Sequence, residues 1–137
     1  MTPLTIALIV ALGAYMLASG IGIARNPAQA RNVISELKSS AALTIITGAF
    51  TFALGAAVIM AHNKWGNFLE GFVSLVGWSA AGQGLLLLAA PGLIFSLAET
   101  LAPSDRMARL FGVITLTVGA CLLFIGLPIL SLFASPV

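Results

Sequence analysis

The chain has 137 residues, of which 60% are hydrophobic and only 7% are charged, and its formal net charge is +2. A water-soluble domain of this size needs far more charge to cover its surface, so this composition excludes an ordinary soluble protein. The small positive charge gives no support to a nucleic-acid-binding surface.

Four apolar stretches are each long enough to cross a hydrocarbon core of about 30 Å, which takes about 20 helical residues. They cover residues 4–23, 41–61, 72–90 and 110–133. The first stretch follows Met1-Thr2-Pro3 and lacks the basic segment of a signal peptide, so we expect it to remain as a transmembrane helix. The sequence therefore predicts an all-α, four-helix transmembrane bundle that forms a single domain over residues 1–137.

A short amphipathic segment follows the first span. It starts at Asn26-Pro27, a helix cap with a first-turn proline. Its apolar stripe consists of Ala30, Val33, Ile34 and Leu37. A matching stripe follows Pro91 and consists of Ile94, Leu97, Ala98 and Leu101. This periodicity is typical of helices that lie in the membrane interface, so we expect two short interfacial helices.

Glycines and prolines recur at a fixed offset of sixty-four residues. The pairs are Gly13/Gly77, Gly20/Gly84, Pro27/Pro91, Gly48/Gly112 and Gly55/Gly119. Glycine and proline determine where backbones approach closely and where helices begin, so the match predicts a shared architecture. We expect two parallel helical-hairpin repeats, residues 1–64 and 65–137, related by an axis along the membrane normal.

Small residues line one face of each span. Lipid tails are as apolar as leucine, so membrane helices associate where small side chains let their backbones touch. We predict a helix-packing seam made of Gly13, Gly20, Gly48, Gly55, Gly77, Gly84, Gly112 and Gly119. A second stripe predicts a further contact face for the other half or another protomer. It consists of Ala49, Ala53, Ala57 and Ala61.

The basic residues are distributed unequally between the connections. The first and third connections hold Arg25, Arg31, Lys38, Arg106 and Arg109, whereas the second holds only Lys64. Cytoplasmic loops of membrane proteins carry the excess of Lys and Arg. We therefore expect the first and third connections, with the interfacial helices, in the cytoplasm and both chain termini outside.

His62, the only histidine, lies in a polar turn after the second span, three residues before Trp65. One interpretation is an interfacial turn in which Trp65 anchors the chain at headgroup level. The other is a cofactor-binding residue that acts as the axial ligand of a haem or chlorophyll. One imidazole without neighbouring Cys, Asp or His side chains cannot build a protein-only metal site. We expect no metal and no cofactor.

Four further residues are candidates for a ligand or ion pathway, namely Glu70, Gln83, Thr51 and Trp78. Glu70, near the start of the third span, is either a proton- or cation-binding carboxylate or a headgroup-level acid near Lys64. Gln83 lies deeper in the span and is expected to hydrogen-bond Thr51 or its neighbours Thr44 and Thr47, or else to contact a ligand. Trp78 is expected to pack beside Gly77, or to stack on a flat ligand. The lone Cys121 lies mid-span, where we expect a buried, inert thiol.

The sequence His62-Asn63-Lys64-Trp65, followed by Gly77-Trp78, Gly84 and Pro91, resembles a group of small bacterial integral membrane proteins without assigned function. Those proteins have four spans. They carry a His-Asn-x-Trp turn that is followed by a Gly-Trp pair, a glycine and a proline. The resemblance implies a bacterial membrane setting and the four-helix layout, and it implies no activity. Together with the orientation from Lys and Arg, we expect a plasma (inner) membrane protein with periplasmic termini.

No nucleophile with its base and no phosphate-binding loop occurs, so we expect no catalytic residues and no enzyme. The leading hypothesis is a self-associating or accessory subunit of a larger membrane complex, in contact with lipid and with other membrane subunits or a second copy. One alternative is a small transporter or channel with Glu70 and Gln83 on its pathway. Another is a pigment- or haem-holding subunit that uses His62.

Overall fold

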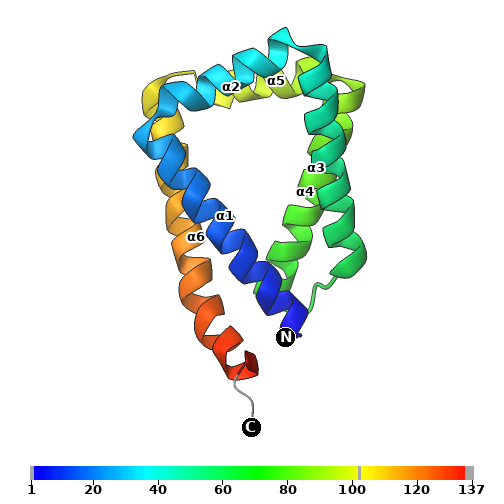
Figure 1. The fold of residues 1–137 in the computed structure, drawn as a ribbon, viewed down its shortest axis with the longest axis vertical. Helices are drawn as coiled ribbons and strands as arrows, with labels where there is room; N and C mark the ends of the chain where they lie inside the picture. The colour runs from blue at the N-terminus through cyan, green and yellow to red at the C-terminus, as the bar shows by residue number, and fades with distance from the viewer. Residues whose placement is uncertain (1, 102, 135–137) are drawn as a thin grey trace. The chain divides into compact units, whose positions relative to one another are not determined.

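The computed structural model describes residues 2–101 and 103–134. Within this part of the chain there are six helices and no strand (Figure 1). They are α1 (Pro3–Arg25), α2 (Pro27–Ser39), α3 (Ala41–Ala61), α4 (Phe68–Ala89), α5 (Pro91–Leu101) and α6 (Asp105–Ala134). Helices α1, α3, α4 and α6 are long and apolar enough to cross a membrane. The all-α, multi-pass membrane architecture and its four spans are confirmed.

Polar caps determine where the long helices begin. The Ser40 hydroxyl accepts a hydrogen bond from the Leu43 amide at 3.3 Å at the start of α3. The Asn67 side chain accepts one from the Glu70 amide at 3.0 Å at the start of α4. Such caps satisfy backbone donors that have no partner inside the helix. Consequently α4 begins at Phe68, before the apolar stretch that hydropathy alone marks from residue 72.

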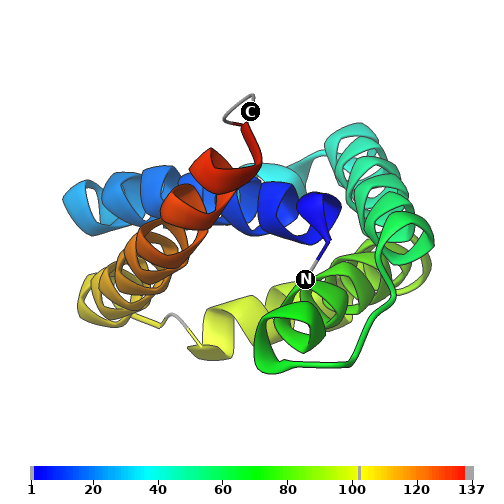
Figure 2. The same cartoon turned by 90° about the horizontal axis from the view of Figure 1, so that it is seen from below.

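The helices form two compact units. One unit, Met1–Ala28 with Ser104–Val137, contains α1 and α6. The other, Gln29–Pro103, contains α3, α4, α5 and most of α2. Within the units, α1 lies along α6 and α3 lies along α4 (Figures 1 and 2). Each packed pair therefore combines a span from residues 1–64 with a span from residues 65–137.

The contact between α1 and α6 requires glycine. A Cβ atom added to Gly20 would lie 2.7 Å from the Cα atom of Leu116 and 2.8 Å from the carbonyl oxygen of Gly112. Both neighbours are backbone atoms, so no side-chain rotation could make room. The two helices therefore approach to direct backbone contact, as small residues allow in membrane proteins.

The contact between α3 and α4 has the same form. A Cβ atom added to Gly84 would lie 2.6 Å from the Cα atom of Phe52 and 2.7 Å from the carbonyl oxygen of Gly48. Gly84, Phe52 and Gly48 stand sixty-four positions from Gly20, Leu116 and Gly112. The other close approaches follow the same register and join Gly13 to Gly119 and Gly77 to Gly55. Each pair is thus built on two glycine–glycine contacts.

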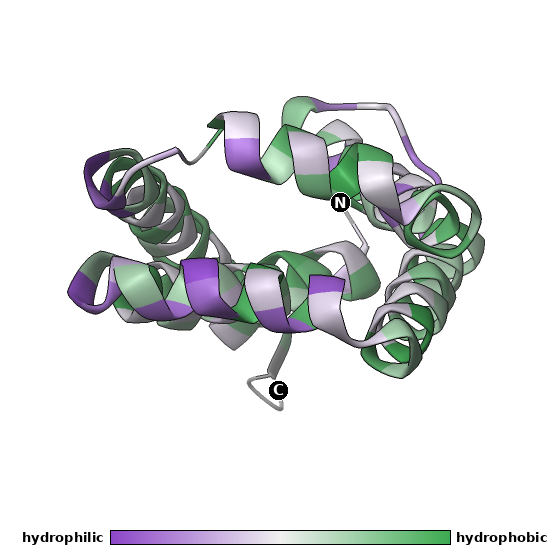
Figure 3. Cartoon of the chain, turned by 90° about the horizontal axis from the view of Figure 1, so that it is seen from above, coloured by the Kyte–Doolittle hydropathy of each residue, from purple (hydrophilic) through white to green (hydrophobic). Residues whose placement is uncertain are grey.

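Apart from the glycines, buried apolar side chains fill the contact between the helices of each pair. Ile6 and Ile9 of α1 are buried together with Ala108 and Leu122 of α6 in one unit. Val73, Ala81 and Leu87 are buried on α4 in the other. Large apolar side chains are otherwise exposed along the spans, as expected where the solvent is lipid. Figure 3 shows the hydrophilic colour concentrated on α2, whereas the spans are mostly hydrophobic.

The short helices α2 and α5 are each covered along one face. Pro27 is buried on α2, and Ala30, Ile34 and Leu37 are partly covered. Phe95 is the buried side chain of α5, with Ile94 and Ala98 partly covered. Val33, Leu97 and Leu101, which belong to the predicted interfacial stripes, are exposed. The covered face of α5 thus centres on Phe95, a residue outside the predicted apolar stripe.

Candidate functional site

The turn between α3 and α4 gathers the polar side chains that the sequence analysis singled out near the second connection. His62 follows the last residue of α3 and its backbone amide donates to the Val58 carbonyl at 2.7 Å. The side chains of His62 and Ser74 have no exposed surface, and Glu70 is 8% exposed. A histidine, a serine and a carboxylate thus lie buried around one short connection.

The Ser74 hydroxyl ties this turn to α4. It donates to the Lys64 carbonyl at 2.7 Å and accepts from the Lys64 amide at 3.1 Å. It also lies 3.4 Å from His62 Nδ1. One hydroxyl therefore satisfies both backbone groups of a residue outside any helix, which would otherwise be costly to bury. We interpret Ser74 as a structural clasp, which could not be recognised from the sequence because an isolated serine in an apolar span carries no motif.

Glu70 lies in the first turn of α4, three residues after the capping residue Asn67. A Cβ atom added to Gly66 would lie 2.8 Å from Glu70 Oε2, so the carboxylate lies over the turn. An acidic side chain at this position is favoured by the positive end of the helix dipole and resembles the acidic member of a capping box. The position of Glu70 in the first turn of α4 thus explains why a carboxylate is favourable there.

Trp65 is 61% exposed, and its indole nitrogen donates to the Asn63 side chain at 3.0 Å. The indole therefore has a partner while most of its ring remains uncovered. This is the arrangement that aromatic residues at a membrane boundary adopt, with one polar atom bonded and the ring available to lipid.

The mid-span candidates do not converge with this turn. Gln83 and Trp78 are both exposed on α4, Trp78 to 53%, so Trp78 does not pack as a buried wedge beside Gly77. Among the described residues Gln83 forms no hydrogen bond with the threonines of α3. Thr44 instead donates to the Leu37 carbonyl at 2.7 Å, and Thr51 is only partly covered. The Gln83 amide therefore projects from a span without a partner in its own helix pair.

The second small-residue stripe of α3 is uncovered. Ala49, Ala53, Ala57 and Ala61 are all exposed, whereas the glycine face of the same helix is occupied by α4. The residues sixty-four positions later on α6 are Val113, Thr117, Cys121 and Ile125, and they are exposed as well. Cys121 is thus exposed rather than buried, which corrects the expectation of an enclosed thiol. The equivalent face of α6 therefore lacks the alanines that α3 presents.

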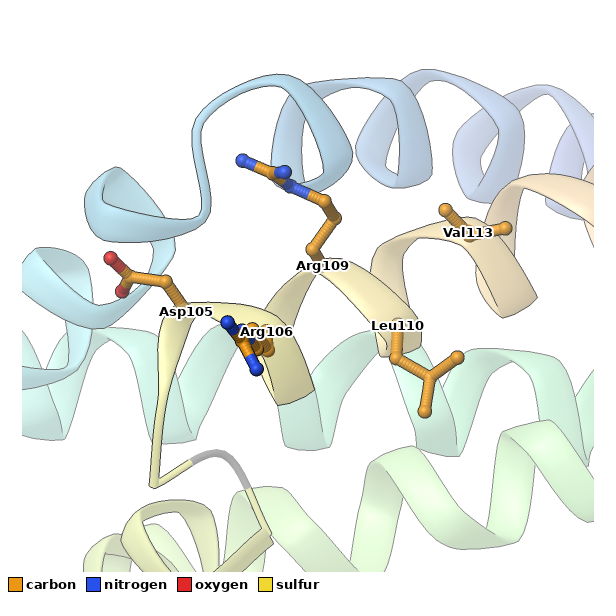
Figure 4. Close-up of a pocket in the computed structure, with 5 residues that line it drawn as sticks. All are labelled: Asp105, Arg106, Arg109, Leu110 and Val113. Atoms are coloured by element: carbon orange, nitrogen blue, oxygen red, sulfur yellow. The ribbon is translucent and has the colours of Figure 1, made fainter.

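An open hollow of about 370 Å³ lies beside the first turns of α6. Its lining residues are Asp105, Arg106, Arg109, Leu110 and Val113. Figure 4 shows Asp105, Arg109 and Val113 along one edge of the helix and Arg106 and Leu110 along the next. From the sequence, the two arginines are a topology signal and are explained by local pairing, caps and headgroup contacts. Arg109 lies three residues after Arg106, and Leu110 and Val113 each lie four residues after one of the arginines. This spacing predicts that they share one helix face.

No group of three or more metal-ligating side chains occurs among the residues that the structure describes. Comparisons with protein-family models, with curated proteins and with solved structures found no match to this chain.

Proposed function

We propose that this protein is a non-enzymatic membrane subunit that associates with a second copy through the alanine face of α3. The observation that supports it is the exposed run of Ala49, Ala53, Ala57 and Ala61 on a helix whose other small face is already occupied. Alanines at four-residue steps let a neighbouring helix approach closely, and such faces drive association in lipid, where apolar bulk alone does not. The subunit serves as a packing element within a larger membrane assembly.

The test uses a matched pair of cysteine positions. Ala57 on α3 and Cys121 on α6 stand sixty-four residues apart and both are exposed. We expect the double variant Ala57→Cys/Cys121→Ala to form disulfide-linked dimers when native membranes are oxidised. The unmodified chain, which carries only Cys121, should link far less, and adding Ala53→Leu to the double variant should abolish linkage. Equal linkage at both positions, or none at Ala57→Cys, would contradict the proposal.

The alternative is a small transporter, and the observation that favours it is the unpaired Gln83 amide on an apolar span. Polar groups inside a membrane face partners, water or a transported solute. In proteoliposomes, Gln83→Leu and Glu70→Gln should each abolish flux if these residues line a pathway. Flux that persists in both variants would exclude this pathway, and the absence of any flux in the unmodified protein would favour the packing role. A visible absorption band lost in His62→Ala would instead indicate a haem- or pigment-holding subunit.

We further infer that residues 1–64 and 65–137 are two copies of one unit, placed in a bacterial inner membrane with α2 and α5 at the cytoplasmic interface. The helix bounds and the glycine contacts support the two copies, because they recur at the sixty-four-residue offset. The distribution of arginine and lysine supports the orientation. Cysteine labelling of Cys121→Ala variants tests it: Ser39→Cys should react only from the cytoplasmic side and Asn63→Cys only from outside. The reverse pattern would overturn the orientation.

A further inference from the structure

The hollow beside α6 changes from charged to apolar along one helix face. Arg106 and Arg109 occupy the first turns, and Leu110 and Val113 follow at the three- and four-residue steps that keep side chains on one face. From Arg106 to Val113 the helix rises by about 10 Å. Both leucine and valine are about half exposed, at 51% and 47%. The hollow thus offers a cationic end and an apolar end within one membrane leaflet.

The arginine side chains at the cationic end of the hollow are available to bind an anion. Arg106 and Arg109 are exposed and form no hydrogen bond or ion pair with other residues that the structure describes. Asp105 also lines the hollow, but it has an interaction of its own and leaves the lining with a net positive charge. Two guanidinium groups one turn apart suit a phosphate, because each presents a planar fork of donors to oxygen atoms.

We propose that this hollow binds an anionic membrane phospholipid. Its phosphate lies between Arg106 and Arg109, and the upper part of an acyl chain lies along Leu110 and Val113. The order of polarity argues for a lipid over a free phosphate, which would use the arginines alone and leave the apolar end uncovered. The site is formed by α6 alone, so it does not depend on the proposed self-association through α3.

The binding test uses defined lipids and single variants. The purified protein, in detergent with added phosphatidylglycerol or phosphatidylcholine, is examined for bound lipid by native mass spectrometry. We expect selective retention of phosphatidylglycerol, weakened about fivefold by Arg106→Gln and again by Arg109→Gln, since each basic residue near a membrane surface contributes on this scale. Lys64→Gln, which removes one charge from the α3–α4 turn, is the matched control and should leave retention unchanged.

Two further measurements separate the lipid from its phosphate. Leu110→Asn should weaken phosphatidylglycerol retention, and inorganic phosphate at equal concentration should not displace the lipid. Both arginines are exposed, so circular dichroism should show unchanged helix content in the glutamine variants. Equal retention of both lipids, or equal loss in Lys64→Gln and Arg106→Gln, would overturn the proposal. Displacement by inorganic phosphate would overturn it in favour of a simple anion site.

Discussion

The two helix pairs of this protein share their glycine contacts and differ in their connections and outer faces. In α1·α6 and in α3·α4, glycines sixty-four positions apart bring the backbones together. Only α3 and α4 are joined directly by a short turn, clasped by Ser74, and the alanine stripe of α3 has no equivalent sixty-four positions later on α6. The comparison teaches that the seam requires particular residues at a few positions, whereas the opposite faces are free to diverge. Association with partners is therefore expected on the faces where the pairs differ.

The glycine seams give the largest expected effects. Gly84→Ala should lower the free energy of unfolding by about 2–3 kcal/mol, because the new methyl group meets backbone that cannot move aside. Gly20→Ala should cost a similar amount in the other pair. Reversible unfolding in mixed detergent micelles measures both.

Each of these variants has a control on its own helix. Gly82 and Gly22 have no heavy atom within 4 Å of an added Cβ, so their alanine variants should be neutral or slightly stabilising. Equal stability of Gly84→Ala and Gly82→Ala would contradict the α3·α4 contact described above. A much smaller loss of stability in Gly20→Ala than in Gly84→Ala would show that the two pairs are not equivalent.

Removal of the Ser74 hydroxyl tests the feature that only one pair has. Ser74→Ala leaves the Lys64 amide and carbonyl without their partner and should cost about 1–3 kcal/mol. The residue sixty-four positions earlier is Val10, so α1 has no counterpart of the clasp. Thermal unfolding in detergent gives the measurement, with the exposed Ser79→Ala as control. If the two serine variants unfold at the same temperature, the clasp contributes nothing.

The serine caps provide a smaller and symmetric test. Ser40 and Ser104 accept hydrogen bonds from the Leu43 and Met107 amides at 3.3 and 3.4 Å, at equivalent places in α3 and α6. Each alanine variant should lose about 1 kcal/mol, the usual value of such a cap. The same unfolding assay should give two values that agree; a cost at only one of them would show that the two helix starts are not equivalent.

The smallest effect is expected for the ion pair between α2 and α5. Lys38 Nζ lies 2.6 Å from Glu99 Oε1, but the two side chains are 45% and 57% exposed. A double-mutant cycle with Lys38→Met and Glu99→Gln should give a coupling below about 1 kcal/mol that falls as salt is added. A larger, salt-independent coupling would mean that the pair is shielded from water.

The spans and their small faces could be predicted because hydropathy and residue size act locally. Ala41–Ala61 is predicted to the residue, while α4 and α6 begin earlier than their apolar stretches because Asn67 and Ser104 cap them. Which spans pack together could not be predicted. The seams of α3 and α6 carry the same glycine spacing, so α1 is equally complementary to either, and only the three-dimensional contacts distinguish them.

The candidate site was predicted less completely than the spans. His62 and Glu70 could be assigned to one turn from their closeness in sequence, but the burial of His62 and its contact with Ser74 of the next helix could not be predicted. The outward direction of Gln83 depends on the rotation of α4 about its axis, and the glycines and Ala81 decide that rotation by facing α3. The sequence thus predicts how deep a polar residue lies along an apolar span more readily than which side of the helix it occupies.

The pairing of α1 with α6 has a consequence for biogenesis. During synthesis α1 is made before α3 and α4, yet the backbone that it contacts at Gly112 and Gly119 is made after both of them. The α3·α4 pair, joined by its short turn, meets no such delay. A ribosome-stalled intermediate that ends after α5 should therefore show α3 cross-linked to α4, and α1 cross-linked to the insertion machinery or to lipid. In that interval the glycine face of α1 has not yet met the helix that covers it.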